Sequence, residues 1–526
     1  MPPPFNSRQK LTSTVTQQQI LQLLGQGSLR ALFANHLGRN ATQDDEDEED
    51  ESGMFGYNMS GRRLRRRRKT QEDSQFPPIP NPEGRKLMAS GKFGTEEQKR
   101  GTLRSRKKMA YRTMMRELGL GSPGSERSRN SLIAHDMIPS TKPDTIINYN
   151  ARCYSGQFSE DGNFFFSCSQ DFKVRMYDTS NPYRWKYYKT AVYYGGQWTI
   201  TDASLSPDNK YLAYSSIRPQ VCLAPTDPDN TADPYVLDFS NTGDSRRYGS
   251  RWGIWSVRFS GDGREIVAGT SDHSLYVYDV ESNQSVLRIQ GHQDDVNAVC
   301  YGDKNSPHIL LSGSDDATVK VWDRRSLGDG REAGVFVGHT EGVTYVDSKG
   351  DGRHVISNSK DQTMKLWDMR KMVSPDKAAS IDPQEYMTNF DYRFSRYDES
   401  ERTINPHDCS LVTFRGHKVL KTLIRCHFSP PGSTDGRYVY SGSHDGSVYI
   451  WNLDATLKTK IDILSATRNS RPIEDERFVD RWDMSGGGQW STIVRDVSWH
   501  PNAPVIAGKS TLTYIHRSSS SIIEQF

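Results

Sequence analysis

The sequence predicts an all-β fold, a β-propeller built from four-stranded blades, and two adjacent repeats near its centre are the main reason. Each repeat begins with a Gly-His pair, at 291–292 and at 338–339, and ends with a Trp-Asp pair, at 322–323 and at 367–368. The two tryptophans are 45 positions apart (322 to 367), which is the length of one four-stranded blade. This fixed spacing, with weaker copies on both sides, predicts a closed ring of blades.

The repeats also predict a buried polar relay inside each regular blade. An aspartate accepts from the histidine ring, the ring bonds to a serine hydroxyl, and the serine accepts from the tryptophan indole N–H. Since buried polar atoms are costly unless paired, we expect these residues to stabilise the fold and not to bind ligands. The full set occurs three times: His292, Ser312, Asp316 and Trp322; His339, Ser357, Asp361 and Trp367; and His417, Ser441, Asp445 and Trp451.

The remaining repeats are less regular, and with them we count seven blades between residues 145 and 517. Blade two has Leu223 where we expect the tryptophan, and blade seven lacks the turn aspartate. A strand near 146–149 is expected to complete the last blade, which leaves no free sheet edge. We predict insertions at 371–413, where an eighth blade is the alternative, and at 457–489, and a C-terminal tail at 518–526.

The first 140 residues are expected to lie outside the ring. Residues 1–40 contain two short helices that need a surface to pack on, either a partner protein or the propeller itself. Their apolar positions are Ile20, Leu21, Leu24, Leu29, Leu32 and Phe33. Residues 41–140 predict a charged, mostly disordered linker with an acidic run at 44–51 and a basic run at 62–69. The basic run fits a nuclear-import signal, contact with RNA or DNA, or charge that only solubilises the chain.

Composition narrows the class of protein further. The chain has 526 residues with 68 basic and 65 acidic side chains, so its net charge of +3 predicts no class of partner. Six cysteines without a C-x-x-C pair favour a reducing compartment and argue against a disulfide framework. The sequence has neither a signal-peptide core nor an apolar run of about 18 residues, so we expect a soluble intracellular protein without a membrane partner.

No group of residues in the sequence indicates catalysis, a cofactor or a metal ion. Ser, His and Asp recur together because the relay uses them. The residues His407-Asp408-Cys409 and Cys426-His427 do not match the spacing of a zinc site. We therefore expect a binding protein that is not an enzyme.

Two arginines are the main candidates for binding. Arg325 and Arg370 each stand three positions past a blade tryptophan, where the third strand has just ended. We expect both guanidinium groups to emerge on the same face of adjacent blades. Arginine suits a protein interface because its planar guanidinium can bond a carboxylate or carbonyl at two points.

These segments resemble a known family. The runs 311–325 and 356–370 resemble the WD-x-R box of substrate receptors of cullin-four RING ubiquitin ligases, although Asn358 replaces the small residue usual there. Longer runs at 294–299, 346–351, 357–362 and 423–429 are similar to the family of WD-repeat-containing protein 23, also called DCAF eleven. The similarity covers most of 150–515.

The resemblance implies a seven-bladed WD-repeat propeller that serves as a substrate receptor. The protein would dock on the adaptor, damage-specific DNA-binding protein one, through Arg325, Arg370 and the helices of residues 1–40. The adaptor would in turn link it to the cullin. A target protein of unknown identity would meet the opposite face, at the loops of His292, His339 and His417. We expect this protein in nucleus and cytoplasm, with no nucleic-acid partner. The alternative is a nuclear WD-repeat scaffold for RNA processing or ribosome assembly.

Overall fold

A computed structural model describes most of the repeat region and part of the segment before it. The described residues are 76–94, 114, 137–149, 151–240, 252–388, 390–395, 397–398, 404–467, 492–510 and 514–519. The chain divides into two compact units, Met1–Thr70 and Gln71–Phe526, and all described residues belong to the second. The helices predicted within 1–40 and the basic run at 62–69 therefore lie outside the described residues.

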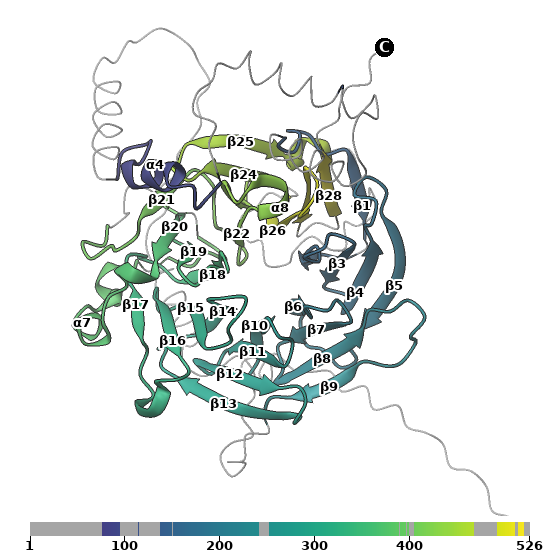
Figure 1. Cartoon of the computed structure of the whole chain (residues 1–526), viewed down its shortest axis with the longest axis horizontal. Coiled ribbons are helices and arrows are strands. Elements are labelled where there is room, and N and C mark those ends of the chain that lie inside the picture. Colours follow the sequence, from purple (N-terminus) through teal and green to yellow (C-terminus); the bar gives the residue numbers. More distant parts are fainter. Residues whose placement is uncertain are drawn as a thin grey trace, which may run out of the picture. The chain divides into compact units, whose positions relative to one another are not determined.

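The described strands form seven four-stranded antiparallel sheets arranged in a ring, which confirms the all-β propeller class (Figure 1). Six sheets consist of four consecutive strands each, and we number them as blades one to six in chain order. The seventh combines β26, β27 and β28 with β1. The first strands of neighbouring blades contact each other and lie nearest the ring axis.

The strand bounds follow in blade order. Blades one to three are β2 (Cys153–Ser155), β3 (Phe164–Ser169), β4 (Lys173–Asp178) and β5 (Lys186–Val192); β6 (Ile200–Leu205), β7 (Tyr211–Ser216), β8 (Gln220–Pro225) and β9 (Tyr235–Asp238); and β10 (Ile254–Phe259), β11 (Glu265–Thr270), β12 (Ser274–Asp279) and β13 (Gln284–Gln290). Blades four to six are β14 (Val296–Tyr301), β15 (Ile309–Ser314), β16 (Val319–Asp323) and β17 (Gly334–Phe336); β18 (Val343–Ser348), β19 (His354–Ser359), β20 (Met364–Asp368) and β21 (Val412–Phe414); and β22 (Cys426–Phe428), β23 (Tyr438–Ser441), β24 (Ser447–Asn452) and β25 (Leu457–Asp462). Blade seven is β26 (Val494–Trp499), β27 (Val505–Ser510), β28 (Tyr514–Ser519) and β1 (Thr145–Asn148).

The ring closes as the sequence predicts. Strand β1 pairs antiparallel with β28, with Thr145 opposite Arg517 and Asn148 opposite Tyr514. The first strand of the repeat region thus completes the last blade. Because β1 covers the backbone groups of β28, blade seven does not end on an unpaired β28 edge.

The hydrophobic core lies between neighbouring blades. Trp322 and Trp367 are fully buried, and each packs against residues of the blade before its own. In blade two the strand register overturns the prediction for Leu223. Ala224 pairs with Leu212 as Trp322 pairs with Leu310, so Ala224 stands at the tryptophan position. A shift of one residue along a strand moves a side chain to the other face, and Leu223 therefore faces blade three.

The polar relay forms in blades four and five. In blade four His292 bonds Asp316 through Nδ1 at 2.7 Å and Ser312 through Nε2 at 2.7 Å, and the indole of Trp322 donates to Ser312 at 2.8 Å. Blade five repeats this arrangement. There His339 bonds Asp361 at 2.8 Å and Ser357 at 2.7 Å, and Trp367 donates to Ser357 at 2.7 Å.

The relay predicted for blade six is wrong. His417 Nε2 bonds Asn358 Oδ1 of blade five at 2.8 Å, while Ser441 donates to the carbonyl of Arg425. Asp445 accepts from Tyr449 and Lys460, both at 2.8 Å. The reason is Asn358, the residue that departs from the usual pattern: its amide reaches the neighbouring blade and bonds the histidine there.

Residues 371–413 connect the third and fourth strands of blade five, β20 and β21. The described residues of this segment form short helices in place of a further sheet: η2 (Met369–Lys371), α7 (Pro375–Ala379) and η3 (Pro383–Tyr386). Val373 exchanges two backbone hydrogen bonds with Val335 of blade four, at 2.8 and 2.9 Å. The segment thus begins against the outer strand of the preceding blade.

The insertion predicted at 457–489 starts later than we expect. Residues 457–462 form β25, the outer strand of blade six, and are followed by α9 (Ile463–Thr467). Only Ile461 of this strand is buried. An outer strand that buries so little can consist mostly of polar residues, and its sequence then resembles that of a loop. The two remaining short helices are η1 (Leu327–Asp329) and α8 (Pro431–Thr434), and no described helix has the length and hydropathy needed to span a membrane.

Part of the segment predicted as a mostly disordered linker, 41–140, is folded. Residues 76–94, which we name the strap, contain helix α4 (Pro82–Ala89) and pack on blades five and six. Asn81 caps the helix by accepting from the backbone N–H groups of Glu83 and Gly84, at 2.9 and 3.1 Å. Phe93 near the end of the strap is 1% exposed.

Candidate protein-binding surface

The two faces of the ring differ in which strand connections they carry. Arg325 and Arg370 follow the third strands β16 and β20 of adjacent blades, at equivalent positions. Because neighbouring blades repeat the same strand directions, both arginines lie on one face, which we name the arginine face. The loops of His292, His339 and His417 precede first strands and lie on the opposite face, which we name the histidine face.

Arg325 is exposed and held in place by its own blade. Its side chain is 64% exposed, and it donates through Nε and Nη2 to the Asp323 carboxylate at 2.9 and 2.7 Å. This bidentate bond holds the pKa of Asp323 below its usual range. A guanidinium has five N–H donors, so Arg325 keeps donors that point away from Asp323.

Arg370 is also exposed, but its surroundings differ. The equivalent aspartate, Asp368, is already bonded by Arg353, whose Nη2 lies 2.5 Å from Oδ2. Within the part of the chain that the structure describes, the guanidinium of Arg370 has no hydrogen-bond or ion-pair partner. Arg370 therefore presents an unpaired positive charge on the arginine face.

A cavity of about 490 Å³ lies beside Arg370, and the strap helps to form it. It is lined by Lys92, Lys349, Asp351, Gly352, Arg353, His354, Met369 and Arg370. Phe93 of the strap packs edge-on against His354 with ring centroids 4.9 Å apart, and Lys349 donates to the carbonyl of Lys92 at 2.5 Å. Four of the eight lining residues are basic and one is acidic, so the cavity favours anionic groups.

On the histidine face, the segment after β20 packs over the loops of blades five and six. Thr388 donates through its backbone N–H and its hydroxyl to Glu341, at 2.8 and 2.6 Å. The ammonium of Lys360 lies 4.3 Å from the ring centre of Tyr392. These contacts place part of 371–413 at the histidine face, beside the His339 loop.

Further around this face, two tryptophans lie next to carboxylates. Trp198 is 56% exposed and meets Trp255 edge-on with ring centroids 6.4 Å apart, and Trp255 donates to Asp295 at 3.2 Å. Burial and the neighbouring aspartates raise the pKa of Asp295 to about 6. His273, Asp294 and Asp295 bring one ligand atom each within 4.8 Å, although the first two residues are exposed.

The inner strands carry a buried charge network that the sequence analysis missed. Asp202 on β6 lies 2.6 Å from Arg258 and 2.8 Å from Arg425, and Asp496 on β26 lies 3.0 Å from His427. Burial alone would raise the pKa of Asp202, but Arg258 and Arg425 outweigh it and hold the pKa below its usual value. Because these charges come from separate blades, no local pattern in the sequence brings them together. Their mutual pairing fits a structural role.

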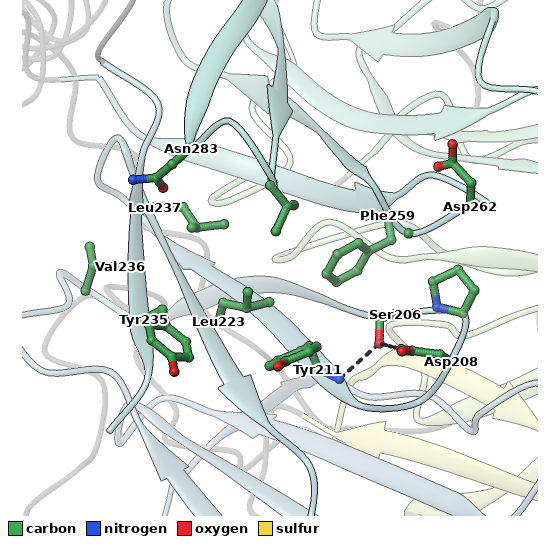
Figure 2. A pocket seen from close by; sticks show the side chains of 13 residues that line it. Ser206, Asp208, Tyr211, Leu223, Tyr235, Val236, Leu237, Phe259, Asp262 and Asn283 are labelled. Carbon is green, nitrogen blue, oxygen red and sulfur yellow. Dashed lines mark hydrogen bonds between the residues drawn. The ribbon is translucent and has the colours of Figure 1, made fainter. Parts of the chain in front are cut away.

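A groove lies between blades two and three (Figure 2). It opens on the arginine face, because its lining includes turns that join first to second strands, at 206–208 and 262–263. Its volume is about 630 Å³. The side chains that line it are mostly apolar or aromatic, with aspartates at one end: Ser206, Pro207, Asp208, Tyr211, Leu223, Tyr235, Val236, Leu237, Phe259, Asp262, Gly263, Val280 and Asn283. Sequence reasoning did not find this groove, because its walls come from turns and strands of two blades.

The remaining predicted adaptor contacts are not described by the structure. Ile20, Leu21, Leu24, Leu29, Leu32 and Phe33 lie outside the described residues. Their role stays a prediction.

One family model agrees with the observed fold. The model of the WD domain, G-beta repeat, matches residues 145–178, 245–279, 283–323, 330–368 and 408–452. The solved WD40 β-propeller domain of Doa1 is 17% identical, with a TM-score of 0.48 over 72% of this chain and 97% of that one.

Several curated proteins are similar over most of the repeat region. The LEC14B protein of Lithospermum erythrorhizon is 42% identical over 388 residues, which cover 71% of this chain and 74% of that protein. The DDB1- and CUL4-associated factor 11 homolog of Caenorhabditis elegans is 32% identical over 66% of this chain and 58% of its own length. The DDB1- and CUL4-associated factor 11 homolog of Caenorhabditis briggsae is 37% identical over 260 residues, which cover 49% of this chain and 42% of that protein. The chain therefore belongs to the WD-repeat family that includes the LEC14B proteins and the DDB1- and CUL4-associated factor 11 homologs.

Proposed function

We propose that this protein is the substrate-recognition subunit of a cullin-four RING ubiquitin ligase, present in nucleus and cytoplasm. It docks its arginine face on the adaptor, damage-specific DNA-binding protein one, and presents a target protein for ubiquitination. The observation that carries the proposal is the pair of exposed arginines at equivalent positions of adjacent blades. The names of the nematode relatives, which state an association with DDB1 and CUL4, support the same partner.

In this proposal the chain performs no catalytic step. Its contribution is to hold the target close to the ubiquitin-loaded subunits of the ligase, which raises the effective concentration of the target there. The target meets the histidine face, where the exposed Trp198 and the packed segment around Tyr392 offer aromatic contact surface.

Replacing the two arginines tests the docking face. We expect Arg325→Ala and Arg370→Ala each to weaken binding of the purified adaptor about tenfold or more, as central interface arginines do. The double variant should show no measurable binding. Arg184→Ala is the matched control, since Arg184 is an exposed arginine in the same type of connection, between β4 and β5 of blade one.

Binding is measured by biolayer interferometry with the full chain, and circular dichroism checks that each variant is folded. Because both arginines are exposed, their truncation should leave the melting temperature within about 1 °C of the parent. Undiminished binding of a folded double variant would refute the docking assignment.

A further inference from the structure

The groove between blades two and three exists because this blade interface lacks the contact that closes the next one. Between blades three and four, Arg324 reaches back to Glu265 with Nη2 2.9 Å from Oε1. At the interface between blades two and three, Val280 takes the place of Arg324, because its backbone N–H donates to the carbonyl of Arg264 as that of Arg324 donates to the carbonyl of His308. Tyr211 takes the place of Glu265, because each pairs with the last residue of the third strand of its own blade. A valine and a tyrosine form no ion pair, and this interface stays open.

The open interface exposes apolar surface. Leu223 and Leu237 form a buried floor, at 6% and 4% exposure, whereas Tyr211 and Tyr235 on the walls are 39% and 60% exposed. Figure 2 shows Leu223, Leu237, Tyr211 and Tyr235 turned toward a common space between the two blades, whereas Val236 lies on the other side of β9. Exposed apolar residues that line one concave site are typical of a protein-binding surface.

One end of the groove is acidic. Asp208 accepts from the Ser206 hydroxyl at 2.6 Å, and Asp262 accepts from the Ser260 hydroxyl at 2.5 Å. These hydrogen bonds hold the pKa of both carboxyls below the usual range, so both are charged at neutral pH. Among the described residues that line the groove, none is a lysine, arginine or histidine, although Lys210 lies 3.5 Å from Asp208 outside it.

We propose that the adaptor places an aliphatic or aromatic side chain, flanked by a lysine or arginine, in this groove. The inference rests on the proposed function, because it concerns the same partner. The apolar walls would bury the anchor, and Asp208 and Asp262 would pair with the basic neighbour.

Position on the ring argues for the adaptor. The groove opens on the arginine face, and blade three adjoins blade four, which carries Arg325. A stable interface buries about 800 Å² on each partner, which two arginine side chains do not supply alone. The face also has opposite charges at its two ends: the acidic groove, and the basic cavity beside Arg370. Such an arrangement fixes the orientation of a partner.

A charge placed in the groove tests the apolar contact. Tyr235→Glu puts a carboxylate on an exposed position of β9 that faces the groove opposite Leu223, so the ring should fold while the apolar anchor is excluded. We expect its Kd for the purified adaptor to rise about tenfold or more, as at interface hot spots. Val286→Glu is the matched control: Val286 is 50% exposed on β13, also an outermost strand, and does not line the groove. Its Kd should stay within about twofold of the parent.

Neutralising the acidic end tests the basic neighbour. We expect the double variant Asp208→Asn and Asp262→Asn to bind the adaptor about fivefold more weakly at low salt, with the difference shrinking as ionic strength rises. Asp161→Asn is the control, because Asp161 accepts from Ser159 in the equivalent turn of blade one. Its binding should equal that of the parent at every salt concentration.

The outcomes separate the two proposals. Suppose that the adaptor binds the parent, does not bind the Arg325/Arg370 double variant, and binds Tyr235→Glu as it binds the parent. The groove inference is then overturned and the docking face stands. If the adaptor does not bind the parent chain, both proposals are overturned. Weak binding by Tyr235→Glu together with parent-like binding by Val286→Glu supports the groove.

Discussion

Arg325 and Arg370 occupy equivalent positions but are prepared for binding in different ways. Asp323 fixes the guanidinium of Arg325, so this side chain loses little conformational freedom when it meets a partner. Arg353 bonds the aspartate that would do the same for Arg370. Arg370 therefore offers more free donors, and Arg325 a more rigid position. The spacing in the sequence predicts both positions but not this difference.

His417 shows how one buried residue overrides a regular spacing. Blade six has the same intervals from serine to aspartate to tryptophan as blades four and five, yet Asn358 of the neighbouring blade bonds His417 Nε2. Within the described chain, His417 Nδ1 is buried without a partner. Spacing alone cannot say which of two acceptors a histidine meets.

The burial of His417 predicts a pH dependence of stability. Burial lowers the pKa of His417 to about 4 from an ordinary value of 6.5. Between pH 6.5 and about 4 the unfolded chain binds a proton that the folded chain does not, so this histidine lowers stability as the pH falls. The contribution is about 2–3 kcal/mol across this window.

The variant His417→Gln isolates this effect, because glutamine does not titrate and its amide can still donate to Asn358. We expect the free energy of unfolding of the parent to fall more steeply than that of the variant between pH 6.5 and 4. Denaturant titrations at several pH values measure both. Parallel pH profiles would contradict the assignment of a neutral buried His417.

At the scale of elements, the strap is a folded segment whose composition predicts a disordered linker. Its helix begins with Asn81-Pro82, a recognisable start signal, but the surrounding residues are rich in charge, proline and glycine. What orders the strap is contact with distant parts of the chain. The Asn81 N–H donates to the carbonyl of Asp454 at 2.8 Å, and Lys349 lies 4.0 Å from the ring centre of Phe93.

Gly84 is required for this packing, which gives a test of the strap. A Cβ at Gly84 would lie 2.2 Å from the carbonyl oxygen of Leu453 and 2.6 Å from Asp454 Cα. We expect Gly84→Ala to destabilise the docked strap by about 2 kcal/mol. Trypsin should then cut at Arg85 and Lys86 roughly thirtyfold faster, since cleavage follows the population of the open form.

The control for this experiment is Gly328→Ala. Its Cβ would meet nothing within 4 Å, so tryptic cleavage of the strap should be unchanged. If Gly84→Ala were cleaved at the parental rate, the packing of α4 on blade six would not be what orders the strap.

For the whole molecule, the sequence predicts the all-β ring, its closure by a strand near 146–149 and the common face of the two arginines. These features follow from local repeats, because each blade is built from consecutive strands. The groove, the basic cavity and the inner charge network join residues far apart in the sequence, such as Tyr211 with Val280 and Lys92 with Arg370. No repeat encodes such pairs, so they become visible only in the folded ring.

The proposed function depends on the arginine face being the docking face. A cryo-electron microscopy structure of the full chain bound to the purified adaptor tests it most directly. We expect the guanidinium groups of Arg325 and Arg370 to be buried against the adaptor in that complex. An adaptor seated over the loops of His292 and His339, with both arginines exposed to solvent, would contradict it.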